Sequence, residues 1–93
     1  MTLDLAGITT KQALHELFKV QLGFPEWYGP SWDGFWDCLL SVEEVPNEIV
    51  LVNWQAFAQA CPKDMAILRQ VIQDFEAYQP IKRIIFSETQ ANS

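Results

Sequence analysis

The sequence predicts one small α/β domain, in which about four helices pack against a three-stranded parallel sheet. Residues 2–6, 49–52 and 81–86 are short apolar runs with the composition of strands. The segments between them carry helical repeats of apolar residues and are too long for hairpins, so parallel pairing through crossovers is the economical arrangement. Because no linker, low-complexity stretch or internal repeat divides the chain, we expect a single domain over residues 1–93, with a frayed polar tail at 88–93.

The N-terminal part predicts a strand and then an amphipathic helix. Polar and apolar side chains alternate over residues 2–6, as in a strand. Thr9 or Thr10 then caps a helix over residues 11–22, and Gly23 stands where a left-handed residue ends a helix. The apolar residues of this helix recur at spacings of three and four, and they are Leu14, Leu17, Phe18 and Leu22.

The middle of the chain predicts a loop, a second helix and a buried strand. An ordered loop over residues 24–29 leads into a helix that begins at Pro30 with Ser31 and runs to about Val42. Residues 49–52 are apolar without alternation, which is typical of a strand covered on both faces.

The C-terminal part predicts two further helices and the last strand. Residues 54–60 form a short helix, residues 62–78 a longer one that Pro80 terminates, and residues 81–86 a strand. The apolar stripe of the longer helix consists of Met65, Leu68, Val71, Ile72 and Phe75.

Composition excludes several classes of protein. Six Lys or Arg stand against twelve Asp or Glu, and this net charge of −6 argues against a nucleic-acid-binding module and favours a basic protein partner. The longest aliphatic run, residues 49–52, is too short to span a bilayer, and the N-terminus lacks the features of a signal peptide, so we expect a cytoplasmic protein. Cys38 and Cys61 have no C-x-x-C spacing, which favours reduced cysteines over a disulfide framework or a zinc site.

The net charge comes entirely from residues 20–62, since the rest of the chain carries six acids and six bases. The acids of this segment are Glu26, Asp33, Asp37, Glu43, Glu44 and Glu48. Half of the chain's twelve aromatic residues lie within thirteen positions of this segment, residues 24–36, and they are Phe24, Trp27, Tyr28, Trp32, Phe35 and Trp36. Trp27 and Tyr28 fall on the predicted loop, where a large aromatic ring is hard to bury, so we interpret both as part of a binding surface.

On the second helix, Asp33 and Asp37 lie about 40° apart and form an acidic stripe opposite an apolar face. Like charges at this spacing destabilise a helix by roughly 0.2–0.5 kcal/mol, and Gly34 beside them costs about 1 kcal/mol relative to Ala, so the pattern favours a surface that a partner approaches closely. The simpler alternative is that Asp33 complements the helix dipole and Asp37 is only solvated. Trp32 and Trp36 favour the core.

Catalysis and metal binding are the competing hypotheses. His15 with Cys38 or Cys61 forms a conceivable nucleophile pair, but a lone His on a Leu-rich helix is typical of a partly buried structural residue. Asp33 and Asp37 lack the further oxygen ligands that a hard cation requires. We therefore expect no catalytic residue, no metal and no cofactor.

One segment carries a resemblance. Its sequence is Phe24-Pro-Glu-Trp-Tyr-Gly-Pro-Ser-Trp-Asp-Gly-Phe-Trp-Asp-Cys-Leu39, which resembles the central motif of the barstar family of bacterial ribonuclease inhibitors. Three further segments also resemble the corresponding family segments, and they are Leu14-His15, the strand-to-helix junction over residues 49–54, and residues 84–87. The resemblance implies a barstar-like three-stranded parallel sheet, and an acidic helix with its preceding loop that stand in for substrate phosphates.

The resemblance also implies roles for individual residues. Asp37 matches the aspartate that enters the enzyme's phosphate site, and Asp33 matches a second acid on the same stripe. Trp27 and Tyr28 match an aromatic pair, and Gly29 matches a glycine whose backbone approaches the enzyme. Asp74 aligns with a glutamate that contributes to binding. Taken together with the residue patterns above, the full set of candidate partner-binding residues is Trp27, Tyr28, Gly29, Ser31, Asp33, Gly34, Trp36, Asp37 and Asp74.

The chain departs from the family pattern mainly around this acidic centre. Trp27 stands for Tyr, Ser31 for Asn, Trp32 for Leu, Gly34 for Ala and Asp74 for Glu. Because specificity between related interfaces depends on such differences, the identity of the nuclease stays open. We expect a bacterial, cytoplasmic inhibitor, an immunity protein or antitoxin, that is monomeric when free, contacts no nucleic acid directly and blocks a basic ribonuclease. The alternative is an acidic adaptor of barstar fold that binds another basic protein.

Overall fold

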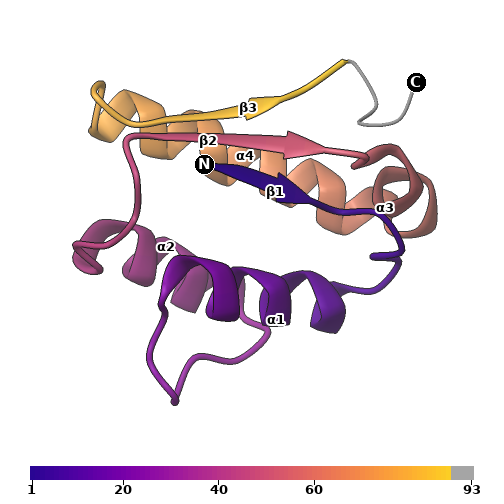
Figure 1. The fold of residues 1–93 in the computed structure, drawn as a ribbon, viewed down its shortest axis with the longest axis horizontal. Coiled ribbons are helices and arrows are strands. Elements are labelled where there is room, and N and C mark those ends of the chain that lie inside the picture. The colour runs from indigo at the N-terminus through magenta and orange to yellow at the C-terminus, as the bar shows by residue number, and fades with distance from the viewer. Residues whose placement is uncertain (89–93) are drawn as a thin grey trace.

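A computed structural model describes residues 1–88 of the chain (Figure 1). The elements in chain order are β1 (Thr2–Asp4), α1 (Lys11–Leu22), α2 (Trp32–Ser41), β2 (Glu48–Val52), α3 (Gln55–Ala60), α4 (Pro62–Tyr78) and β3 (Arg83–Phe86). The three strands pair in parallel in the order β1-β2-β3, so β2 is the central strand. The predicted fold class, a three-stranded parallel sheet with four helices, is confirmed.

The helix boundaries follow local signals. Thr10 caps α1, because its hydroxyl oxygen accepts a 3.1 Å hydrogen bond from the backbone N–H of Ala13. Gly23 ends α1 in the left-handed conformation with φ of 70°, as its position predicted. The second helix starts at Trp32 rather than at Pro30, since Ser31 is extended and its hydroxyl oxygen caps the backbone N–H of Gly34.

Two strands are shorter than expected because turns form at their ends. β1 stops at Asp4, whose carboxylate accepts the backbone N–H of Ala6, although Leu5 N–H still bonds to Val52 on the neighbouring strand. Before β3, the N–H of Lys82 turns back to the carbonyl of Gln79. The expected frayed tail lies, apart from Glu88, outside the described residues.

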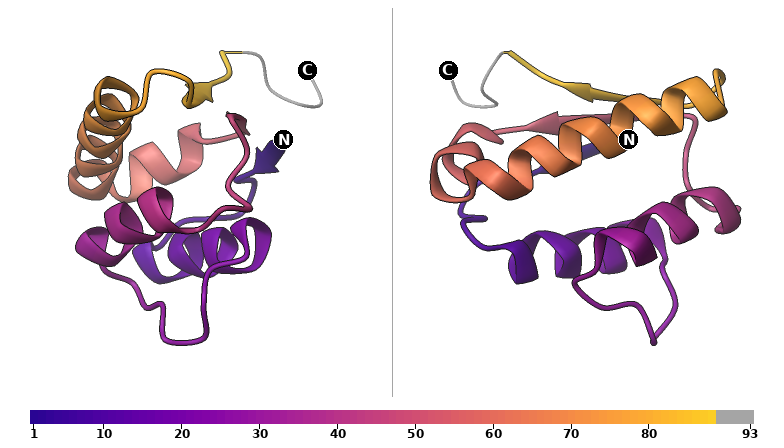
Figure 2. Two further views of the ribbon diagram at one scale, coloured as in Figure 1. Left: turned by 90° about the vertical axis from the view of Figure 1, so that its left-hand side faces the viewer. Right: turned by 180° about the vertical axis from the view of Figure 1, so that it is seen from behind.

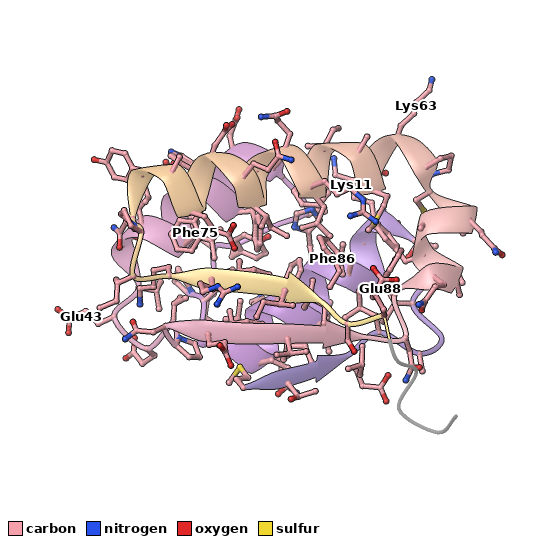
Figure 3. The ribbon with its side chains drawn as sticks, turned by 90° about the horizontal axis from the view of Figure 1, so that it is seen from above. Lys11, Glu43, Lys63, Phe75, Phe86 and Glu88 are labelled. Carbon is pink, nitrogen blue, oxygen red and sulfur yellow. The ribbon has the colours of Figure 1, made fainter. Side chains whose placement is uncertain are left out.

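The helices gather on one face of the sheet (Figure 2). Along the strands, every second residue is buried against them, and these residues are Leu3, Ile49, Leu51 and Ile84. Phe75 points from α4 toward the sheet and is 1% exposed (Figure 3). The prediction that residues 49–52 are covered on both faces is wrong: Val50 and Val52 alternate with the buried Ile49 and Leu51, so they lie on the other face of the sheet, and they are only half-buried.

Candidate functional site

The acidic stripe of α2 is at the surface. Asp33 and Asp37 are exposed, whereas Phe35, Cys38 and Leu39 on the opposite side of the helix are buried in the core. Within residues 1–88, neither carboxylate is paired with a cationic side chain. The helix therefore presents two solvated negative charges on one face, which is the arrangement that the sequence predicted.

A groove between α2 and α4 brings together residues that are far apart in the chain. Its volume is about 480 Å³. The residues that line it are Trp32, Asp33, Trp36, Ile67, Val71 and Asp74. Three of the predicted partner-binding residues, Asp33, Trp36 and Asp74, thus share one hollow that apolar side chains and two carboxylates line together.

Sequence reasoning missed one wall of this groove. Ile67 was not singled out and is 41% exposed, and Val71 was assigned to the core stripe but is only half-buried. Together with Asp74 they recur at spacings of four and three on α4, so they lie on one helix face. That spacing was the available signal, and it describes a second, narrower stripe beside the buried one.

The loop over residues 24–31 carries the aromatic pair, and its two members differ. Trp27 is 71% exposed, as expected for a binding surface. Tyr28 is only 5% exposed, so the expectation that its ring is displayed is wrong. The physical reason is that α1 supplies a buried polar partner: the Tyr28 hydroxyl and Nδ1 of His15 share a hydrogen bond inside the core.

Burial controls the ionisation of this pair. Burial first, and then the nearby charge of Lys11, lowers the pKa of His15 from 6.5 to about 4, while Asp64 acts in the opposite direction. Burial, followed by the influence of Cys38, raises the pKa of Tyr28. Both groups are therefore neutral at pH 7, and His15, which is 2% exposed, is buried more completely than the partly buried histidine that its position on α1 predicted.

The two cysteines are free, and they differ in environment. Cys38 is fully buried, and this burial, with a smaller contribution from Asp37, raises the pKa of its thiol. A raised pKa is the opposite of what a nucleophilic cysteine requires. Cys61 is half-buried between α3 and α4, where its thiol donates to the carbonyl of Thr9.

Two further kinds of feature do not occur in the part of the chain that the structure describes. No three His, Cys, Asp or Glu side chains there lie close enough together to hold a metal ion. Nor does any helix among residues 1–88 combine the length and the apolar character needed to cross a bilayer.

The fold and the exposed surface of α2 define a small parallel α/β protein with an acidic helix, an exposed loop tryptophan and a groove between α2 and α4. The model of the family described as Barstar (barnase inhibitor) matches residues 1–88, and the chain belongs to this family. A Bacillus subtilis (strain 168) protein named "Putative ribonuclease inhibitor YrdF" is 39% identical over 44 residues. This match covers 47% of the chain and 48% of that relative, so the chain spans about half the length of the curated relative that it matches.

Proposed function

We propose that this protein inhibits a basic ribonuclease by covering its active site with the acidic face of α2 and the loop before it. The observation that carries the proposal is the pair of solvated carboxylates, Asp33 and Asp37, on the helix of a barnase-inhibitor family member. An enzyme that binds RNA holds cationic groups where the phosphates sit. Carboxylates at fixed spacing on a rigid helix are complementary to such a site, and long-range attraction speeds the encounter.

The individual residues divide the work. Asp37 enters the phosphate site and Asp33 occupies its edge, while Trp27 covers apolar surface beside it. Gly29 in the loop and Gly34 on the helix lack side chains, so a partner's backbone approaches closely at both. Ser31 fixes the start of α2 by its cap on Gly34.

The groove between α2 and α4 takes a long cationic side chain of the nuclease. Its aliphatic stem lies along Trp36 and Val71, and its charged end meets Asp33 and Asp74, which line the same hollow. Arg fits best, because its planar guanidinium binds carboxylates at two points and stacks on aromatic rings.

Tyr28 has a supporting role in this proposal instead of a contact role, because its ring is buried. The inhibitor works in the cytoplasm as an immunity protein or antitoxin, where its two free cysteines stay reduced, and it is monomeric before it binds. Neither a cofactor nor a metal takes part.

The test is calorimetric titration of the protein against a panel of purified bacterial ribonucleases, each at low and at high salt, with RNA cleavage assayed in parallel. We expect one-to-one binding to at least one basic ribonuclease, loss of its RNA cleavage, and affinity that falls with salt. Failure to inhibit any ribonuclease in the panel, or affinity that salt leaves unchanged, contradicts the proposal. Capture of a basic protein that is not a nuclease instead favours the acidic-adaptor hypothesis.

A further inference from the structure

The loop over residues 24–31 is anchored to α1 by one buried polar contact. Tyr28 and His15 are 5% and 2% exposed, and the tyrosine hydroxyl is hydrogen-bonded to Nδ1 of the histidine. Trp27, the adjacent residue, is 71% exposed. The loop therefore turns one aromatic ring inward and the next outward, and α1 holds the inward one.

The surroundings of Tyr28 connect the loop to both helices. Its ring centroid lies 4.9 Å from that of Phe24 in the same loop, and the imidazole of His15 lies 4.5 Å from the ring of Trp32 on α2. A Cβ at Gly34 would lie 3.8 Å from the Tyr28 ring. A shift of the Tyr28 ring would thus change the packing at the first turn of α2, which contains Asp33.

Apolar packing alone does not explain a polar pair at this place. Of the buried residues in the described part of the chain, His15 is the polar one, set among aliphatic and aromatic side chains. A hydroxyl and an imidazole must meet in a defined geometry, whereas an apolar side chain of similar volume packs in several. If either partner is lost, the other is left buried without its hydrogen bond. The pair therefore selects one position for Tyr28 and, through the chain, one position for Trp27.

We propose that His15 is a positioning residue for recognition: through the Tyr28 hydroxyl it fixes the 24–31 loop so that Trp27 and the Gly29 backbone are presented beside Asp33. The identity of the partner rests on the ribonuclease-inhibitor proposal, but the fixing of the loop does not. Preorganisation of this kind lowers the conformational cost of binding, so its loss increases the dissociation rate of a complex more than it slows association.

Amide hydrogen exchange of the free protein tests the fixing of the loop. Tyr28→Phe removes only the hydroxyl, and His15→Leu keeps an apolar volume but removes the hydrogen-bond partner of that hydroxyl. We expect either change to accelerate exchange at the Tyr28 amide, which donates to the carbonyl of Pro25, by about tenfold, while the amides of β2 keep their rates. His15→Gln, whose amide can donate or accept a hydrogen bond, should recover part of the protection.

Tyr78→Phe is the matched control, because it removes a hydroxyl from the other tyrosine of the chain, which is 67% exposed. Unchanged loop exchange in Tyr28→Phe overturns the inference. Equal acceleration in the loop and in β2 also overturns it, since the pair would then serve only global stability. If His15→Leu does not fold, Tyr28→Phe decides alone.

A second measurement links the pair to recognition. With a ribonuclease that the wild-type protein inhibits, Tyr28→Phe should raise the dissociation rate about tenfold and change the association rate less than threefold. Dissociation at the wild-type rate overturns the recognition role. If the wild type inhibits no ribonuclease in the panel, the inhibitor proposal fails while the exchange experiment still decides whether His15 fixes the loop.

Discussion

Trp32 and Asp64 join the two helices that form the groove: the indole Nε1 of Trp32 donates a 3.1 Å hydrogen bond to Oδ1 of Asp64. Trp32 begins α2, and Asp64 lies in the first turn of α4. The contact therefore ties the start of one helix to the start of the other, beside the hollow that holds Asp33 and Asp74.

Removal of this contact should lower stability. Asp64→Ala deletes the acceptor of a part-buried hydrogen bond and a negative charge near a helix N-terminus, so we expect the free energy of unfolding to fall by about 1–2 kcal/mol. Asp64→Asn keeps an acceptor oxygen, so its free energy of unfolding should fall by less than that of Asp64→Ala. Urea unfolding measures both, and an Asp64→Ala variant as stable as the wild type would show that the contact contributes nothing.

The buried imidazole should make stability depend on pH. Because the pKa of His15 is lowered from 6.5 to about 4 in the folded chain, the unfolded chain takes up the proton first as the pH falls. The stabilisation is fully present above about pH 6.5 and is lost progressively toward pH 4, by about 2 kcal/mol between pH 7.5 and pH 5. Besides burial, which is the main cause, the charge of Lys11 also lowers the pKa of His15, and Asp64 raises it.

His15→Gln separates this contribution from those of the other ionisable groups, which both proteins share. Urea unfolding at pH 7.5 and pH 5 should show that the free energy of unfolding falls less between these pH values in the variant than in the wild type. If the free energy of unfolding falls equally in the two proteins, His15 is not the cause of the pH dependence of stability.

Gly34 is a site where stability can be gained. A Cβ there meets Ser31 at 3.7 Å and the Tyr28 ring at 3.8 Å, which are ordinary contacts. Gly34→Ala should therefore raise the free energy of unfolding by about 0.5–1 kcal/mol, as the difference in helix propensity predicts. Gly23→Ala is the control of opposite sign, because Gly23 has φ of 70° and should lose stability. Thermal unfolding of the two variants checks both signs, and a destabilised Gly34→Ala would refute the expectation.

Trp27 should matter for binding and not for folding. Its side chain is 71% exposed, so Trp27→Ala should change the free energy of unfolding by less than about 0.5 kcal/mol. Large aromatic residues dominate many interfaces, and we expect ribonuclease affinity to fall by about tenfold or more. Val20→Ala, at a 65% exposed apolar residue of α1, is the matched control. Equal affinities of the Trp27 variant and the wild type would remove Trp27 from the interface.

Much of the fold was predictable because its signals are local. Pro62 and Pro80 bracket α4, and Thr10 and Gly23 bracket α1, so propensity and capping settle these helices within a residue or two. The strands were less predictable at their ends. Whether β1 stops at residue 4 or 6 depends on a turn that the Asp4 carboxylate makes, which a pattern of alternation does not contain.

The site was predictable where a side chain's exposure follows from helix geometry, as for Asp33 and Asp37. It was not predictable where distant segments meet. The inward turn of Tyr28 depends on His15, 13 residues earlier, and the groove depends on the packing of α2 against α4. Asp74 was predicted as a site residue from the family resemblance alone, and Ile67 was identified only in the structure. Tertiary packing, not composition, decides these positions.

The most direct test of the account is the affinity of Asp37→Asn for an inhibited ribonuclease, measured beside Glu48→Gln. Both changes remove one exposed negative charge from the acidic segment, the first from α2 and the second from the start of β2. If Asp37 enters the nuclease's phosphate site, Asp37→Asn should weaken binding by about 100-fold or more, because it leaves buried cations of the enzyme unpaired, whereas Glu48→Gln should change it by no more than about threefold. Equal affinities for the two variants would contradict the claim that α2 is the inhibitory element.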